Sequence, residues 1–133
     1  MDKLEHTLSK SILIFLKSNF DLSVDHLEFQ LTRKDFDGDL TLVLFPLLKK
    51  TSISPQVLGE KLGTYLIEHS DFVENFNIVS GFLNLSISDA HYLAFLKQML
   101  LEDGYGHKKA NSDAPTLMVE YSSPNTNKPL HLG

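Results

Sequence analysis

The sequence predicts an α+β fold in which helices cover one face of an antiparallel sheet. Apolar residues recur at helical spacing in three stretches, shorter strand-like stretches lie between them, and short turns join those strands in pairs. Strands joined by short turns pair antiparallel, so the order helix, two strands, helix, two strands, helix gives a two-layer domain. At 133 residues, 42% of them apolar, the chain is long enough for one stable core.

The chain begins with a helix and a hairpin. One face of residues 1–19 is apolar at helical spacing, and residues 26–32 then alternate as a half-buried strand does. Residues 33–39 have turn chemistry, because Gly38 can adopt a positive φ. A second strand is expected over residues 40–45, and the proline after it limits its pairing. The apolar positions of the helix and the first strand are Leu4, Leu8, Ile12, Phe15, Leu16, Leu27, Phe29 and Leu31.

A second helix and hairpin follow in the same order, and a third helix closes the domain. Ser54 can cap the second helix, and Pro55 suits its first position. Residues 80–81 form the hairpin turn, and Ser88 or Asp89 caps the third helix. The apolar positions are Leu58, Leu62, Tyr65 and Leu66 in the second helix; Phe76, Ile78, Leu83, Leu85 and Ile87 in the hairpin; and Tyr92, Phe95, Leu96, Met99 and Leu100 in the third helix.

The sequence changes character after the third helix. Residues 104–115, GYGHKKANSDAP, show no periodicity and indicate a linker. A new strand is expected from Thr116 to Tyr121, followed by a loop and a turn that can open a helix near His131. We therefore expect a first domain over residues 1–103. Residues 116–133 would then be the truncated start of a second domain, an α/β nucleotide-binding fold.

Composition and charge exclude several classes of function. There is no cysteine, so no disulfide framework or thiolate metal site is expected. The N-terminus lacks the apolar stretch of a signal peptide and no apolar run approaches membrane-spanning length, so we expect a cytoplasmic protein without a membrane partner. We also expect a monomer. A net charge of −5 argues against a general nucleic-acid binder and against DNA. Contact with RNA would be local, through the basic pairs at 33–34, 49–50 or 108–109, although such pairs are more often solvated surface.

The final segment has the residue types of a phosphate-binding turn. A strand, a loop and a glycine at a helix start let phosphate approach backbone N–H groups. Gly133 leaves room for a nucleotide, His131 can donate to a phosphate or carboxylate, and Lys128 supplies a mobile cation. His-Leu-Gly alone is a weak signal, for which a surface histidine at a frayed chain end is the better interpretation.

The longer string around it is specific. Residues 123–133, SPNTNKPLHLG, resemble the signature Ser-Pro-Asn-x-x-Lys-Pro-x-His-x-Gly-His that opens the class I catalytic domain of arginyl-tRNA synthetases. Residues 80–84, SGFLN, are similar to a Gly-Phe-Ile-Asn stretch of that family, in which a helix–hairpin–helix–hairpin–helix domain of this length precedes the catalytic domain. The chain stops one residue before the second histidine of the signature. The resemblance therefore implies an N-terminal fragment of a longer enzyme, inactive by itself.

The resemblance also implies roles for residues of the final segment. The residue matching Glu120 lies beside bound arginine, and those matching Asn125 and His131 contact it. The lysine matching Lys128 assists with the ATP phosphates, and together with His131 and Gly133 it belongs to the catalytic set. The implied cofactor is ATP with Mg²⁺, and the implied partners are arginine and its tRNA. This agrees with the chemistry, since a carboxylate suits a guanidinium and positive donors suit transition-state charge on ATP.

The outer sheet face is the candidate RNA contact. Because the other residues of its strand point inward, Phe82, Asn84 and Ser86 are expected to point outward, and Asn75 and Asn77 to share that face. An exposed ring beside amides can stack on an unstacked base and read its edge. In the family that the chain resembles, this domain contacts the D-loop corner of tRNA, and the residues matching Phe82 and Asn84 occupy contact positions.

Other interpretations remain open at the level of sequence. Phe82 lies next to the turn at Gly81 and can instead pack beneath a loop. The outer face can also serve as a protein-interaction surface, in which case binding would respond little to salt. A free-standing nucleotide-binding enzyme would require more chain than is present.

Overall fold

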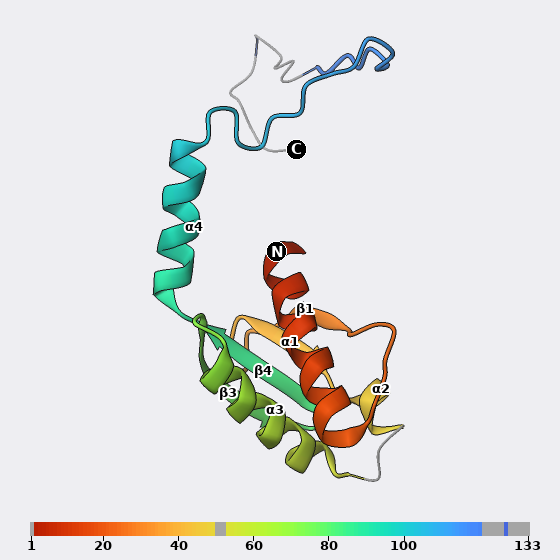
Figure 1. Ribbon diagram of the computed structural model, residues 1–133. Coiled ribbons are helices and arrows are strands. Elements are labelled where there is room, and N and C mark those ends of the chain that lie inside the picture. Colours follow the sequence, from red (N-terminus) through yellow and green to blue (C-terminus); the bar gives the residue numbers. More distant parts are fainter. Residues whose placement is uncertain (1, 50–52, 121–126, 128–133) are drawn as a thin grey trace. The chain divides into compact units, whose positions relative to one another are not determined.

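The structure, a computed structural model, describes residues 2–49, 53–120 and 127 (Figure 1). The chain divides into two units, Met1–Leu101 and Glu102–Gly133, and all helices and strands of the described residues lie in the first. In chain order they are α1 (Asp2–Phe20), β1 (Phe29–Leu31), β2 (Leu40–Val43), α2 (Phe45–Leu48), α3 (Pro55–His69), β3 (Val73–Val79), β4 (Phe82–Ile87) and α4 (Asp89–Leu101). This combination of helices with an antiparallel sheet confirms the predicted α+β class.

The two hairpins join through their second strands. The sheet has the order β1-β2-β4-β3, and each neighbouring pair is antiparallel. In the central pair, Leu42 lies opposite Leu83, and Thr41 opposite Asn84. The turn between β3 and β4 has φ values of 48° at Ser80 and 87° at Gly81. A tight two-residue hairpin turn of type I′ needs positive φ at both positions, so the turn predicted here is confirmed.

The core lies between the sheet and the two long helices α1 and α3, which cover the same face (Figure 1). Helix α3 begins as predicted, because the Ser54 hydroxyl oxygen accepts a hydrogen bond of 3.3 Å from the backbone N–H of Val57. The inward positions predicted on β4 are buried. Leucine dominates the core, whose largest fully buried side chains are Leu8, Ile12, Leu16, Leu40, Leu42, Leu44, Leu47, Leu58, Leu62, Leu66, Leu83 and Leu85.

The first hairpin has shorter strands than the sequence indicates. The strand predicted over residues 26–32 contains only Phe29–Leu31, and Leu31 is 65% exposed instead of buried. It lies in an edge strand, which has a neighbour on one side only. The second strand ends at Val43, and Phe45 begins the short helix α2 instead of ending the strand. Pro46 accounts for this change, because a residue without an N–H and with a restricted φ suits the first turn of a helix.

Two predicted elements of the C-terminal part also differ. Helix α4 forms, but none of its 13 residues is buried, so the predicted apolar stripe does not reach the core. Ser88 does not cap it through its side chain, since its buried Oγ has no hydrogen-bond partner among the described residues. Residues 116–120 are exposed and form no strand. A strand needs a neighbour for its backbone N–H and C=O groups, and the described residues provide none there.

Candidate nucleic-acid interface

The sheet face opposite α1 and α3 carries the residues that the sequence singled out. Phe82, Asn84 and Ser86 of β4 lie opposite Val79, Asn77 and Asn75 of β3. Because side chains alternate along a strand and cross-strand partners share a face, these six residues point away from the helices. On the other side of β4, Val43 lies opposite Phe82 and Thr41 lies opposite Asn84. The structure therefore brings the four predicted contact residues of β3 and β4 to one face.

A row of hydrogen bonds crosses this face and is called here the polar row. The hydroxyls of Thr32 and Thr41 are 2.9 Å apart, and the Thr41 hydroxyl donates to Asn84 Oδ1 at 2.6 Å. Asn84 Nδ2 donates to Asn77 Oδ1 at 2.8 Å. Asn77 Nδ2 in turn donates to the backbone carbonyl of Asp37. The polar row thus joins three strands and ends on the loop of residues 33–39.

That loop covers Asn84, whose side chain was expected to be exposed. Asn84 is only 2% exposed, and Thr41 beside it is equally buried. Gly38 lies directly above, with φ at 128°, and a Cβ built on it would be 3.2 Å from the Cβ of Asn84. The prediction of an outward direction is right and the prediction of an accessible amide is wrong. A buried amide needs partners for both of its ends, and the polar row supplies them.

Phe82 contacts an aromatic residue that sequence reasoning missed. Its ring is half-buried and meets the ring of Phe45 edge to face, with centroids 5.4 Å apart and an interplanar angle of 84°. Phe45 is itself exposed, and Gly81 permits the approach, since a Cβ there would lie 2.7 Å from the Phe45 ring. The sequence analysis placed residue 45 at the end of a strand and therefore did not predict this contact. The Phe-Pro pair at residues 45–46 could have indicated a helix start.

The two asparagines of β3 are more accessible than Asn84. Asn75 is exposed, and its Oδ1 accepts a hydrogen bond of 2.8 Å from the backbone N–H of Phe76. Asn77 is half-buried, and both ends of its amide take part in the polar row, where Oδ1 accepts from Asn84 and Nδ2 donates to the Asp37 carbonyl. The amide groups that a ligand can reach on this face without rearrangement are therefore those of Asn75 and, in part, Asn77.

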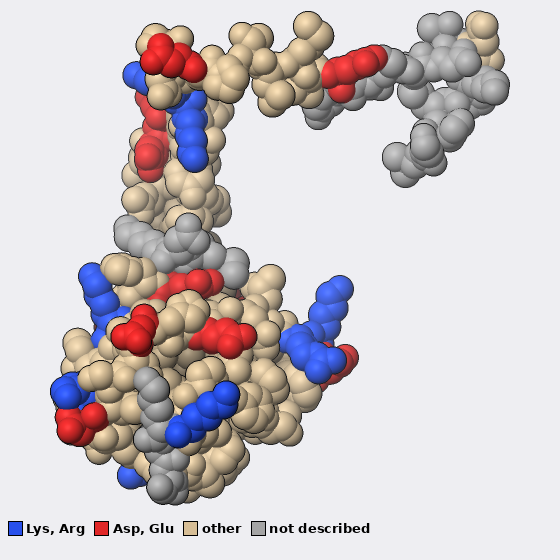
Figure 2. All heavy atoms as spheres, turned by 90° about the vertical axis from the view of Figure 1, so that its right-hand side faces the viewer, with Lys and Arg blue, Asp and Glu red and all other residues tan. Residues whose placement is uncertain are grey.

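Charges of both signs are mixed on the face shown in Figure 2. In Figure 2, lysine and arginine side chains are interspersed with aspartate and glutamate on the face in view. Arg33 and Lys34 are exposed in the loop that the polar row holds against the sheet. The described residues contain no cluster of three or more side chains suited to a metal ion. No helix within the described ranges is both long and apolar enough to cross a membrane.

The predicted catalytic set lies outside the described residues, and of the predicted arginine contacts only Glu120 lies within them. Glu120 is described and exposed. Asn125, Lys128, His131 and Gly133 fall in the ranges that the structure does not describe. Their roles stay predictions from the sequence.

Comparison with known proteins gives a consistent group of relatives. No known family model matches the chain. It is 46% identical to an arginine–tRNA ligase of Flavobacterium psychrophilum over 98% of its own length, and 41% identical to one of Bacteroides fragilis. It spans only 23% and 22% of these two proteins, respectively. Among solved structures, arginyl-tRNA synthetase of Thermus thermophilus is similar, with a TM-score of 0.58 and 29% identity over 73% of this chain and 16% of that one.

Proposed function

Because the chain belongs to the arginine–tRNA ligase family, we propose that it is the N-terminal part of an enzyme that joins arginine to its tRNA using ATP. Two observations support the proposal. The relatives align with nearly the whole chain, and the string SPNTNKPLHLG at residues 123–133 has the signature of a class I catalytic domain. Since the chain spans about a fifth of its relatives, most of the catalytic machinery lies outside it, and these residues alone are inactive.

We assign the parts of the chain as follows. Residues 1–103 form a tRNA-binding domain, residues 104–115 a linker, and residues 116–133 the start of the catalytic domain. In that last segment Glu120, together with Asn125 and His131, would hold the arginine substrate. A carboxylate attracts its guanidinium or ammonium group, and the amide and imidazole offer further hydrogen bonds.

ATP with Mg²⁺ would supply the activated phosphate in the complete enzyme. Lys128 and His131 are hydrogen-bond donors of the type that stabilises developing negative charge, and Gly133 lets the nucleotide approach the backbone. We also propose that the enzyme acts as a monomer in the cytoplasm.

The outer sheet face is the proposed contact with the D-loop corner of tRNA. The accessible part of the Phe82 ring would stack on an unpaired base, and the amides of Asn75 and Asn77 would bind base edges or the backbone. Asn84 is buried, so we assign it an indirect role. It holds the amide of Asn77 in a fixed orientation and, through Asn77, the loop of residues 33–39.

The test is the substitution Phe82→Ala in the full-length ligase. Stacking of a base on an aromatic ring contributes about 1–3 kcal/mol, so the KM for tRNA should rise about 5- to 150-fold. The KM values for arginine and ATP should stay unchanged, because both substrates are assigned to the catalytic domain that begins at residue 116. Steady-state charging assays measure all three constants.

Phe20→Ala is the matched control. Phe20 is also half-buried and also meets one ring edge on, that of Phe15 at 5.9 Å, but it lies on the helix side of the sheet. If both variants raise the KM for tRNA equally, the effect is one of stability and the stacking role fails. If neither changes it, Phe82 is not part of the interface.

The same face could instead bind a protein, and the salt dependence of binding separates the two. Phosphate contacts release counterions, so tRNA affinity falls linearly with the logarithm of salt concentration. Fluorescence titration of tRNA with the full-length ligase over a range of salt measures this slope. A loss of tRNA affinity in a variant of this face would favour RNA contact there, and the slope would also fall where the substitution removes a cation. A face variant that leaves both affinity and slope intact would favour the protein-binding interpretation.

A further inference from the structure

Helix α4 presents a large apolar surface that the rest of the described first unit leaves open. None of its 13 residues is buried, and Leu93 is 56% and Leu100 77% exposed. Asp89 and Lys97 are its only charged residues. A helix on the surface of a finished protein normally has a polar face of several charged or amide side chains. This helix lacks one.

The large apolar residues of α4 form one wide band along the helix. At about 100° per residue, Leu93 and Leu100 lie at one edge of the band, and Tyr92, Phe95, Leu96 and Met99 fill the rest of it, so that together they cover roughly half of the circumference. An apolar band of this width normally faces a core or a partner. Contiguous exposed apolar surface of this kind marks an interface in a soluble protein.

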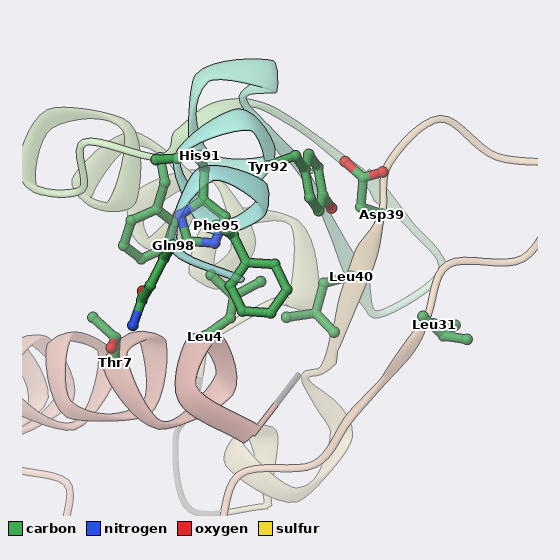
Figure 3. Close-up of a pocket in the computed structure, with 11 residues that line it drawn as sticks. Leu4, Thr7, Leu31, Asp39, Leu40, His91, Tyr92, Phe95 and Gln98 are labelled. Carbon is green, nitrogen blue, oxygen red and sulfur yellow. The ribbon is translucent and has the colours of Figure 1, made fainter. Parts of the chain in front are cut away.

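The surface continues into a cavity of about 470 Å³ at the first turns of α4 (Figure 3). Leu4 of α1 and Leu40 of β2 form part of its wall, together with Phe95. Asp39 stands at one side, with its Oδ2 accepting a hydrogen bond of 2.8 Å from the backbone N–H of Ile87. Partial burial, and the Asp39 carboxylate nearby, raise the pKa of Tyr92, another residue of the wall. The cavity falls in the size range of about 300–1,000 Å³ that is typical of binding pockets.

We propose that this α4 surface, with the adjoining cavity, is the docking site for the part of the ligase polypeptide that lies outside residues 1–133. The inference rests on the proposed function, since it requires the longer enzyme. The relatives are more than four times as long as this chain, so a large polypeptide is available as the occupant. Covalent linkage gives that occupant a high effective concentration at α4.

The chemistry of the surface favours this occupant over others. Permanently covered interfaces are more apolar than transient ones and resemble a divided protein core. RNA would require cations, and Lys97 is the only lysine or arginine of α4. A docked segment would insert apolar side chains beside Phe95 and Leu40, and the polar rim of the cavity at Asp39 and Gln98 would remain at its edge. A second copy of the chain remains as an outcome of the test.

The test compares the reactivity of two introduced thiols in the full-length ligase. The variants are Leu93→Cys on α4 and Ile14→Cys on α1, and their parent side chains are 56% and 62% exposed here. The rate of maleimide modification is read at each site by peptide mass spectrometry, so cysteines elsewhere do not interfere. We expect Leu93→Cys to react at least ten-fold more slowly than Ile14→Cys, at every protein concentration.

Three results would overturn the proposal. Equal rates at the two sites would show that α4 stays open in the complete enzyme. Protection that disappears on dilution would assign the surface to a second copy, and protection that requires added tRNA would assign it to RNA.

Hydrogen exchange of the α4 amides in the unmodified ligase gives an independent measurement, and we expect slow exchange. Neither measurement depends on Phe82 or on charging, so the tRNA interface and the docking surface can fail separately.

Discussion

Asn84 lies at the centre of the polar row, and both ends of its amide are used. It accepts from Thr41 and donates to Asn77 while being 2% exposed. Replacement by alanine would leave the buried Thr41 hydroxyl without this acceptor, and a buried polar group that loses its partner costs about 1–3 kcal/mol. We therefore expect Asn84→Ala to lower the local stability of the sheet by that amount. Hydrogen exchange of the β4 amides in the full-length ligase measures it.

Asn75→Ala is the control for that substitution. Asn75 lies on the same face but is exposed, so its loss should change stability by less than about 0.5 kcal/mol. The opposite result for Asn84, with exchange unchanged but tRNA affinity lost, would mean that Asn84 contacts RNA directly. In that case the loop of residues 33–39 must move aside when tRNA binds.

The alternation of β4 predicted the direction of Asn84 but not its burial, and the reason is physical. Alternation is a local property of a strand, and it places Asn84 opposite to Leu83 and Leu85 whatever else the chain does. Burial depends on Gly38, which lies against the Asn84 side chain in the fold but comes 46 positions before it in the sequence. Only the folded loop brings the two together, through the bond between Asn77 and the Asp37 carbonyl.

At the scale of elements, α3 packs closely on β3 through two glycines. A Cβ on Gly63 would lie 2.5 Å from the ring of Phe76, and one on Gly59 would lie 2.9 Å from the Ile78 side chain. An aromatic ring held between a helix and a sheet cannot yield, so overpacking should outweigh the helix propensity that alanine gains. We expect Gly63→Ala to destabilise the domain by about 1–3 kcal/mol, measured by hydrogen exchange of the α3 and β3 amides.

Gly59→Ala provides the comparison, because the end of the Ile78 side chain can rotate away. Its cost should be clearly smaller than that of Gly63→Ala. Thr64→Ala, at an exposed neighbouring position of α3, should be neutral or slightly stabilising. Equal effects of the two glycine substitutions would indicate that the helix as a whole shifts instead of meeting a rigid ring.

The elements that the sequence predicted well are those with a complete local signal. Ser54 and Pro55 define the start of α3, and the paired positive φ values at Ser80 and Gly81 define the hairpin turn. Helix α2 was missed because its four residues are too few for a periodicity. The stripe of α4 was recognised, but periodicity cannot show whether the surface that a helix packs against lies within the same domain.

For the whole molecule, the balance of charge limits how tRNA can be held. The net charge is −5, and the face shown in Figure 2 has no dominant basic patch. The candidate interface combines few charges with a ring and two amides, so a small number of phosphates should be neutralised there. Arg33 and Lys34 are a basic pair connected to that face, because the bond between Asn77 and the Asp37 carbonyl holds their loop against the sheet.

The basic pair Arg33 and Lys34 offers a test of phosphate contacts at the outer sheet face. If Arg33 and Lys34 contact phosphates, Arg33→Ala with Lys34→Ala should weaken binding of tRNA by the full-length ligase. It should also reduce the slope of log affinity against log salt by about 1–2, because each contact contributes about 0.7–0.9 to that slope. Affinity measured by fluorescence titration over a range of salt concentrations provides the slope.

Lys108→Ala with Lys109→Ala is the matched control, since this pair is exposed and lies in the predicted linker. It removes the same net charge, so any general electrostatic attraction falls equally in both double variants. A larger change of slope in the loop variant locates the phosphate contacts at the outer sheet face. Equal changes would show that only the overall charge matters, and the stacking and amide contacts would then have to orient tRNA on this domain without help from the loop.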